Sequence, residues 1–274
     1  MNEPQRLTTS TSLGPIVRLE AGSGPTIVLL HGIGSSAASW GAQFAGRLTA
    51  THRLVAWNAP GYGGSAALSA PTPLAVDYAE VLAELLAAIG VTRLHLVGHS
   101  LGALIAARFA ADHPHAIASL SLSSCAMGHA RLPADDRARL LASRLDDIRD
   151  LGPQRMAQRR GPRLVRPGAP DAVRDVVIEN MAAVDPQGYA QAAHMLSRGD
   201  LLGDVERLPA TMPVQILCGA LDVITPPEVN QRLAVQRPGT PFTLIPEAGH
   251  AVYLEQPAAF DAALLSFIEA HDDR

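Results

Sequence analysis

Ser100 is the residue best placed by its neighbours to act as a nucleophile. It lies within residues 98–102 (GHSLG), between an apolar run that ends at Val97 and an alanine-rich stretch. The run is typical of a buried strand and the stretch of a helix. Glycine on both sides of the serine allows close backbone approach and strained torsions. A G-x-S-x-G sequence in this strand-to-helix setting predicts a nucleophile elbow; the alternative is an ordinary surface turn.

His250 and Asp222 are predicted to complete a catalytic triad with Ser100. A serine hydroxyl needs a base within hydrogen-bond reach, and His250 directly follows the last expected strand. Asp222 follows the preceding strand, where a carboxylate would fix the histidine tautomer and stabilise the imidazolium. The order Ser, Asp, His differs from that of the two well-known protease types. The alternatives are a surface loop histidine and a turn or helix-capping aspartate.

Two backbone amides are the predicted donors to a developing oxyanion. The Leu101 amide opens the helix after Ser100, where backbone donors and the helix dipole favour negative charge. The Ile33 amide lies in residues 31–34 (HGIG), directly after an early strand. Trp40, Met127 and Val223 are the candidate substrate contacts, although a tryptophan at position 40 also suits core packing.

The elements that must position these residues alternate between strand and helix. Alternation predicts an α/β fold with a mostly parallel, doubly wound sheet that helices cover on both faces. The first two strands are expected to form a hairpin around the turn-rich residues 21–25. The expected strands are 13–20, 26–30, 53–57, 92–97, 119–123, 213–218 and 241–245, and the expected core helices are 39–48, 72–89, 103–111 and 257–270.

Residues 127–199 differ in character from the rest of the chain. They are richer in Arg, Asp and Pro, with helical stretches at 135–151, 171–184 and 188–197 and no convincing strand. We therefore expect a helical lid inserted before the strand that bears the acid. The predicted divisions are a first core part at 1–124, the lid at 125–200 and a second core part at 201–274. The arginine cluster at 155–166 is interpreted as a solvated lid face, with selection of an acidic substrate as the alternative.

Composition excludes several other function classes. The net charge of -4 and the lack of a basic block other than 155–166 argue against nucleic-acid binding. No secretory signal or membrane-spanning run is visible, so a cytoplasmic protein without a membrane partner is expected. The two cysteines are predicted to be reduced and buried. No metal-ligand or phosphate-loop motif occurs, so no metal and no cofactor is expected, and a homodimer is left open.

The chain resembles lid-bearing α/β-hydrolases of the serine type, similar to enol-lactonases and carboxylesterases. Five short sequences carry the resemblance, in the family's order: 29–32 (LLHG), 58–65 (NAPGYGGS), 98–102 (GHSLG), 219–222 (GALD), and 249–250 (GH) followed by 255–257 (EQP). Relatives usually have aspartate where this chain has Asn58, a position that is structural in most members. The resemblance implies the fold and hydrolysis through an acyl-enzyme, with a small molecule as substrate.

The same resemblance separates the branches of the family. Dehalogenases and epoxide hydrolases of this fold place aspartate at the elbow, whereas Ser100 implies acyl transfer. Hydrolases that cleave carbon–carbon bonds of aromatic breakdown products usually carry asparagine before the nucleophile and an aromatic residue after the histidine. This chain has His99 and Ala251 there, which favours an ester or a lactone. A carbon–carbon hydrolase and a non-catalytic small-molecule receptor are the alternatives.

Overall fold

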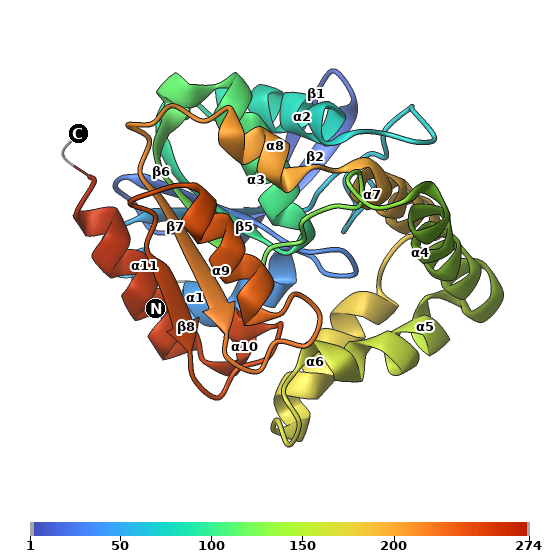
Figure 1. Ribbon diagram of the computed structural model, residues 1–274. Coiled ribbons are helices and arrows are strands. Elements are labelled where there is room, and N and C mark those ends of the chain that lie inside the picture. Colours follow the sequence, from blue (N-terminus) through green and yellow to red (C-terminus); the bar gives the residue numbers. More distant parts are fainter. Residues whose placement is uncertain (1–2, 273–274) are drawn as a thin grey trace.

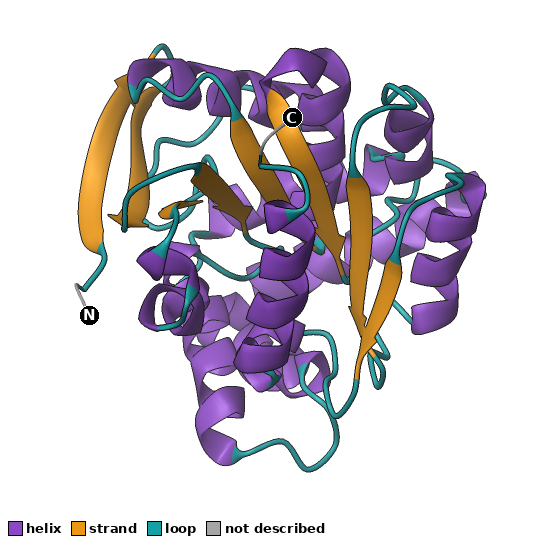
Figure 2. Ribbon diagram, turned by 90° about the vertical axis from the view of Figure 1, so that its left-hand side faces the viewer, coloured by secondary structure: helices purple, strands orange, loops and turns teal. Residues whose placement is uncertain are grey.

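An eight-stranded sheet forms the centre of the protein in a computed structural model that describes residues 3–272. The strand order is β1-β2-β4-β3-β5-β6-β7-β8, and all pairs from β4 to β8 are parallel (Figures 1 and 2). Residues 1, 2, 273 and 274, at the outer bounds of the two predicted core parts, lie outside the described residues. The strands are β1 (Gln5–Thr11), β2 (Gly14–Ala21), β3 (Thr26–Leu30), β4 (Arg53–Trp57), β5 (Leu94–His99), β6 (Ile117–Ser123), β7 (Val214–Gly219) and β8 (Phe242–Ile245).

The central strands are buried on both faces because both faces are covered by helices. Alternate side chains of a strand point to opposite faces, and β3 shows this directly. Val28 and Leu30 belong to one buried cluster, whereas Ile27 and Leu29 belong to another. Near-continuous apolar runs are typical of parallel sheets buried in this way.

Two groups of helices cover the two faces of the sheet. Residues of α2, α3, α8 and α9 join the first buried cluster, and residues of α1, α10 and α11 join the second. Figure 1 shows α11 on the side of the sheet opposite α2 and α3. The helices of the core are α1 (Gly41–Ala45), α2 (Ala75–Ala88), α3 (Leu101–Asp112), α8 (Leu201–Glu206), α9 (Pro227–Gln236), α10 (Val252–Glu255) and α11 (Pro257–Glu269), with 3-10 turns at Ala37–Trp40, Leu48–Ala50 and Pro114–Ala116.

A helical insertion joins β6 to β7, as the change in sequence character predicts. We use "helical insertion" for α4 (Ala134–Asp146), α5 (Gly152–Arg160), α6 (Asp171–Ala182) and α7 (Pro186–Arg198), which gather on one side of the core (Figure 1). A π-helical turn at Asp147–Leu151 and a 3-10 turn at Gly161–Leu164 connect them. After α7 the chain returns to the core, where α8 packs against α3. The exact domain limits stay a prediction.

The prediction of a hairpin between the strands at residues 13–20 and 26–30 is wrong. β2 pairs with β1 and β4, both antiparallel, and β3 lies beyond β4, paired in parallel with β4 and β5. The hairpin that forms is β1 with β2, because residues 5–11, where the sequence predicts no strand, extend along β2. Their side chains are largely exposed, so they lack the apolar run from which a strand is usually recognised.

Candidate active site

The carboxyl ends of five neighbouring strands meet at one edge of the sheet. β3, β5, β6, β7 and β8 end there, and the loops that follow them carry the residues predicted to do chemistry. In open α/β sheets, ligands bind at this edge of the strands. The order of the strands therefore brings together residues that are far apart in the chain, such as Ser100 and His250, which are 150 positions apart.

Ser100 occupies a strained turn between β5 and α3. Its φ of 53° lies in the left-handed region, which costs an ordinary residue about 1–3 kcal/mol unless its surroundings hold it there. Its amide donates to the Ser123 carbonyl at 2.9 Å, and its carbonyl accepts from the Ala103 and Ala126 amides. These hydrogen bonds fix the turn to the end of β6. The backbone geometry is that of the predicted elbow.

Glycines 98 and 102 are required by the close packing of the turn. A Cβ on Gly98 would lie 2.4 Å from the Gly102 carbonyl oxygen, and one on Gly102 would lie 2.4 Å from the Leu30 carbonyl oxygen. Both approaches involve backbone atoms, which cannot rotate out of the way. The small residues therefore let β3, β5 and α3 approach one another beneath Ser100.

Replacing Gly102 with alanine is expected to destabilise the protein by about 1–3 kcal/mol, because an extra methyl group must displace packed backbone. The free energy of unfolding from denaturant titration measures the effect. Gly41→Ala is the matched control, since a Cβ there meets nothing within 4 Å. Equal stability of the two variants would show that the turn is not tightly packed.

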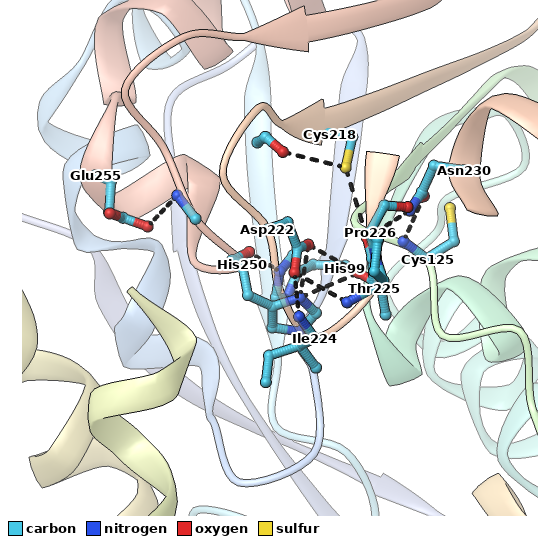
Figure 3. A network of polar contacts seen from close by, with 12 residues as sticks. His99, Cys125, Cys218, Asp222, Ile224, Thr225, Pro226, Asn230, His250 and Glu255 are labelled. Carbon is cyan, nitrogen blue, oxygen red and sulfur yellow. Dashed lines mark hydrogen bonds and ion pairs between the residues drawn. The ribbon is translucent and has the colours of Figure 1, made fainter. Parts of the chain in front are cut away.

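His250 and Asp222 form a hydrogen-bonded pair beside this turn. His250 Nδ1 lies 2.9 Å from Asp222 Oδ2, and both side chains are almost fully buried (Figure 3). Asp222 Oδ1 also accepts from the Ile224 and Thr225 amides at 2.8 and 2.9 Å. The Thr225 hydroxyl donates to Asp222 Oδ2 at 2.8 Å. Because Nδ1 faces the carboxylate, the other ring nitrogen is left for the cavity side.

The hydrogen bonds keep Asp222 ionised despite its burial. Burial alone would raise the pKa of this carboxyl, but the charge and hydrogen bond of His250, together with Thr225, lower it to about 2. A carboxylate that stays ionised at neutral pH is what an imidazolium needs beside it. The electrostatics of the pair therefore suit a base that takes up a proton.

A cavity of about 280 Å³ opens in front of Ser100 and His250. Ile33, Leu101 and Met127 also line it, so five of the eight predicted site residues meet around one space. Asp222, which bonds to His250, is the sixth predicted site residue at this location. The rest of the wall is largely apolar and comes from the core loops and from the helical insertion, as is usual for small-molecule sites.

The Ile33 and Leu101 amides are available as donors at this cavity. Within residues 3–272, no hydrogen bond joins either amide to a protein acceptor. A Cβ on Gly32 would lie 3.0 Å from the Ser100 Cβ, which shows how closely the Ile33 loop approaches the serine. Two amides beside one hydroxyl form the arrangement that tetrahedral oxyanions require.

Two predicted substrate contacts lie outside the cavity. Trp40 is fully buried and stacks on Tyr253 with ring centroids 4.1 Å apart; Tyr253, not Trp40, lines the cavity. Val223 is 62% exposed, because the turn that directs Asp222 inward directs its neighbour to solvent. Ile224 lines the cavity in its place.

Several residues that hold the site were not predicted from the sequence. Thr225 bridges the pair, with its hydroxyl 3.2 Å from His250 Nδ1. Glu255 accepts from the Gly249 amide at 2.7 Å and from the Arg166 amide at 2.8 Å, so it ties the His250 loop to the chain that follows α5. The Glu255-Gln256-Pro257 sequence was the only available signal for this brace.

His99 braces the opposite side of the His250 loop. Its Nε2 donates to the His250 carbonyl at 2.8 Å. Burial, with the charge of His250, lowers the pKa of His99 to about 3, so the ring stays neutral at neutral pH. The residue before the nucleophile therefore fixes the backbone of the predicted base.

The loops after β3 and β4 are held together by polar side chains. Burial lowers the pKa of His31 to about 4, and the neutral ring bonds to the Gly32 carbonyl at 2.9 Å and accepts from the Ala59 amide at 3.1 Å. Asn58 Oδ1 accepts from the Ala37 amide at 2.8 Å. Asn58 therefore acts in loop structure, at the position where relatives usually have aspartate.

The two cysteines are free and buried. Burial raises the pKa of Cys125 well above its usual value and that of Cys218 to about 12. A thiol is a poor nucleophile when protonated, so its burial disfavours a nucleophilic role for Cys125, which lines the cavity. Within residues 3–272, no three His, Cys, Asp or Glu side chains are arranged to hold a metal ion. None of the helices described is long and apolar enough to cross a membrane.

Comparison with models of known families identifies the family of this chain. The model of the "Alpha/beta hydrolase family" matches residues 27–263. The chain belongs to the alpha/beta hydrolase family. The match includes the Ser100 turn, Asp222 and His250.

Named relatives and solved structures are similar to this chain over most of its length. "Putative carbamate hydrolase RutD" of Variovorax paradoxus is 31% identical over 250 residues, which cover 89% of this chain and 92% of the relative. An esterase of Thermogutta terrifontis is 26% identical, with a TM-score of 0.85 over 98% of this chain and 100% of that one. An enol-lactonase of Burkholderia xenovorans, 20% identical, has a TM-score of 0.85 over 96% and 100% of the two chains and shares the fold.

Proposed function

We propose that this alpha/beta hydrolase cleaves a carboxylic ester or lactone of a small organic substrate through an acyl-enzyme. One observation carries the proposal. His250, joined to Asp222 at 2.9 Å, and Ser100, on its strained turn, line the same cavity. A nucleophile, a base and a residue that orients the base are the parts required for acyl transfer.

The proposed reaction has two half-reactions. His250 Nε2 takes the Ser100 proton as the hydroxyl oxygen attacks the carbonyl carbon, and then gives that proton to the leaving alkoxide. Asp222 stays ionised and stabilises the imidazolium that forms in between. Water then attacks the acyl-enzyme with the same base, which releases the acid and restores the serine hydroxyl.

The tetrahedral intermediates need donors for their oxyanion. The Leu101 and Ile33 amides are proposed for this role because they face the cavity and have no protein acceptor within residues 3–272. Each such donor contributes about 3–4 kcal/mol to the stability of the transition state. Met127 is proposed as an apolar contact of the substrate.

A carbamate is the second candidate substrate. The names of relatives about 30% identical to this chain give carbamate hydrolysis, and a carbamate carbonyl passes through the same tetrahedral chemistry. The carbon–carbon hydrolase and receptor alternatives rest on no further observation. Because the cavity is small, about 280 Å³, a short acyl group is expected in each case.

Initial rates on a panel of substrates test the proposal. We expect turnover of p-nitrophenyl esters from acetate to decanoate with an optimum at a short chain, because long chains exceed the cavity. A simple lactone and methyl carbamate extend the panel. If the wild-type protein hydrolyses the carbamate but neither ester nor lactone, the substrate is a carbamate. If no substrate of the panel is turned over, the proposal that the protein hydrolyses these bonds is contradicted.

A further inference from the structure

The wall of the cavity has a strongly asymmetric charge. Three arginines line it, Arg144 from α4, Arg160 from α5 and Arg163 from the turn that follows α5, and none of the lining residues is Asp or Glu. The cationic part of the wall therefore comes from the helical insertion and its connections, and Ser100 and His250 come from the core.

Within residues 3–272, Arg160 is the only one of these arginines that pairs with a carboxylate. Arg160 bonds to Asp147 Oδ2 at 2.6 Å through Nε, and Arg159 pairs with the other oxygen of Asp147 at 2.8 Å. Within residues 3–272, no acidic side chain lies within ion-pair distance, 4.0 Å, of Arg144 or Arg163. Arg163 is exposed, but Arg144 is half-buried.

Two polar side chains, Tyr189 and His129, lie near Arg144. Its Nη1 donates to the Tyr189 hydroxyl at 3.2 Å, and Tyr189 is almost fully buried. His129 lines the same cavity. Burial, followed by the charge of Arg144, lowers the pKa of His129, and its buried Nδ1 has no hydrogen-bond partner within residues 3–272. A guanidinium and an unpartnered ring nitrogen thus share one end of the cavity.

A half-buried cation without a counter-charge is unfavourable unless a ligand supplies the charge. The planar guanidinium fits a carboxylate with two parallel hydrogen bonds, and the Nδ1–H tautomer of His129 would add a third. We propose that the substrate carries a carboxylate, held by Arg144 and His129 at the α4–α7 end of the cavity while Ser100 attacks an ester or lactone carbonyl elsewhere in the same molecule. The inference rests on the proposed function and specifies its substrate as a half-ester or carboxylated lactone.

Matched pairs of esters test the inference. Monomethyl succinate, glutarate and adipate differ from methyl butanoate, pentanoate and hexanoate by a carboxylate in place of a methyl group. We expect kcat/KM of at least one half-ester to exceed that of its neutral partner about tenfold or more, since hydrogen bonds between charged groups are among the stronger ones. Arg144→Met keeps the apolar stem and should abolish this ratio, and Arg144→Lys should retain part of it.

The ratio separates recognition from folding, because a folding defect lowers the rates on both members of a pair. Arg155→Met is the matched control. Arg155 lies on α5, is exposed and does not line the cavity, so the ratio should stay at its wild-type value. A wild-type ratio near one for every pair, with turnover that depends on Ser100, would overturn the carboxylate subsite and leave the proposed function standing.

Binding to the Ser100→Ala protein tests the subsite independently of turnover. Calorimetric titration with monomethyl glutarate should show binding at least tenfold weaker in the Ser100→Ala/Arg144→Met protein than in Ser100→Ala alone. Equal affinities in the two proteins would overturn the inference even if no ester is ever hydrolysed. Loss of turnover on all esters with binding that depends on Arg144 would contradict the proposed function alone.

Discussion

Replacing Ser100 with alanine should lower kcat for the best ester by about 10⁶-fold, to the residual rate that binding and oxyanion stabilisation sustain. The expected loss is large because attack, proton transfer and acyl-enzyme formation all require the hydroxyl. Traces of wild-type enzyme would mask so low a rate. The variant is therefore freshly purified by itself, and its rate is measured under single-turnover conditions. KM should change far less than kcat, since the alanine leaves the cavity wall in place.

Ser197→Ala is the control for this variant. Ser197 is buried in α7 but does not line the cavity, so its replacement should keep wild-type turnover. Activity of Ser100→Ala above about one hundredth of the wild-type value would remove Ser100 from the nucleophile's role, because serine hydrolases lose far more.

Replacing Asp222 with asparagine is expected to lower kcat by about 10⁴-fold while leaving the fold intact. Asparagine keeps the size of the side chain and can still accept from Ile224 and Thr225. Its amide can, however, donate to Nδ1 of His250, which favours the tautomer that leaves Nε2 protonated and unable to act as a base. Since the pKa of Asp222 is about 2, the wild-type carboxylate is ionised throughout any assay above pH 5, and the defect should persist across that range.

Glu228→Gln provides the matched loss of a carboxylate. Glu228 is exposed on α9 and does not line the cavity, so this change should leave kcat at its wild-type value. A similar kcat for Asp222→Asn and Glu228→Gln would mean that the Asp222–His250 hydrogen bond does not matter for turnover.

The positions of the proposed reacting groups were predictable because their neighbours in the sequence determine their place. Ser100, Asp222 and His250 each follow a short apolar strand, and parallel strands end at a common edge, so the strand order alone brings their loops together. The glycines around Ser100 added a steric signal, since only they allow the 2.4 Å approaches found in the turn. The family resemblance covered the same residues.

The walls of the cavity were not predictable in the same way, because they depend on packing between distant segments. Trp40 was assigned to the cavity by its chemistry, but Tyr253 stands in that place and Trp40 packs behind it. Val223 does not line the cavity, because the side chain next to the inward Asp222 points to solvent. Arg144 lies outside the arginine cluster at 155–166, and only the fold of α4 against α7 brings it to the cavity beside Tyr189.

The strand assignments show the same division. The strands β3 to β7 are buried along nearly their whole length and rich in apolar residues, and the sequence predicts each of them. β1 is mostly exposed and was missed, and its absence led to the wrong partner for β2. Local patterns thus locate strands that are buried on both faces, whereas the pairing of an edge strand depends on contacts that no short window contains.

Mass analysis after treatment with an alkyl fluorophosphonate tests the central claim most directly, because this reagent forms a stable bond only with a serine that a neighbouring base activates. We predict one adduct per chain, on the peptide that contains Ser100, and a strongly reduced labelling rate in His250→Ala. An adduct on any other residue, or labelling of Ser100 that is equally fast without His250, would contradict the account.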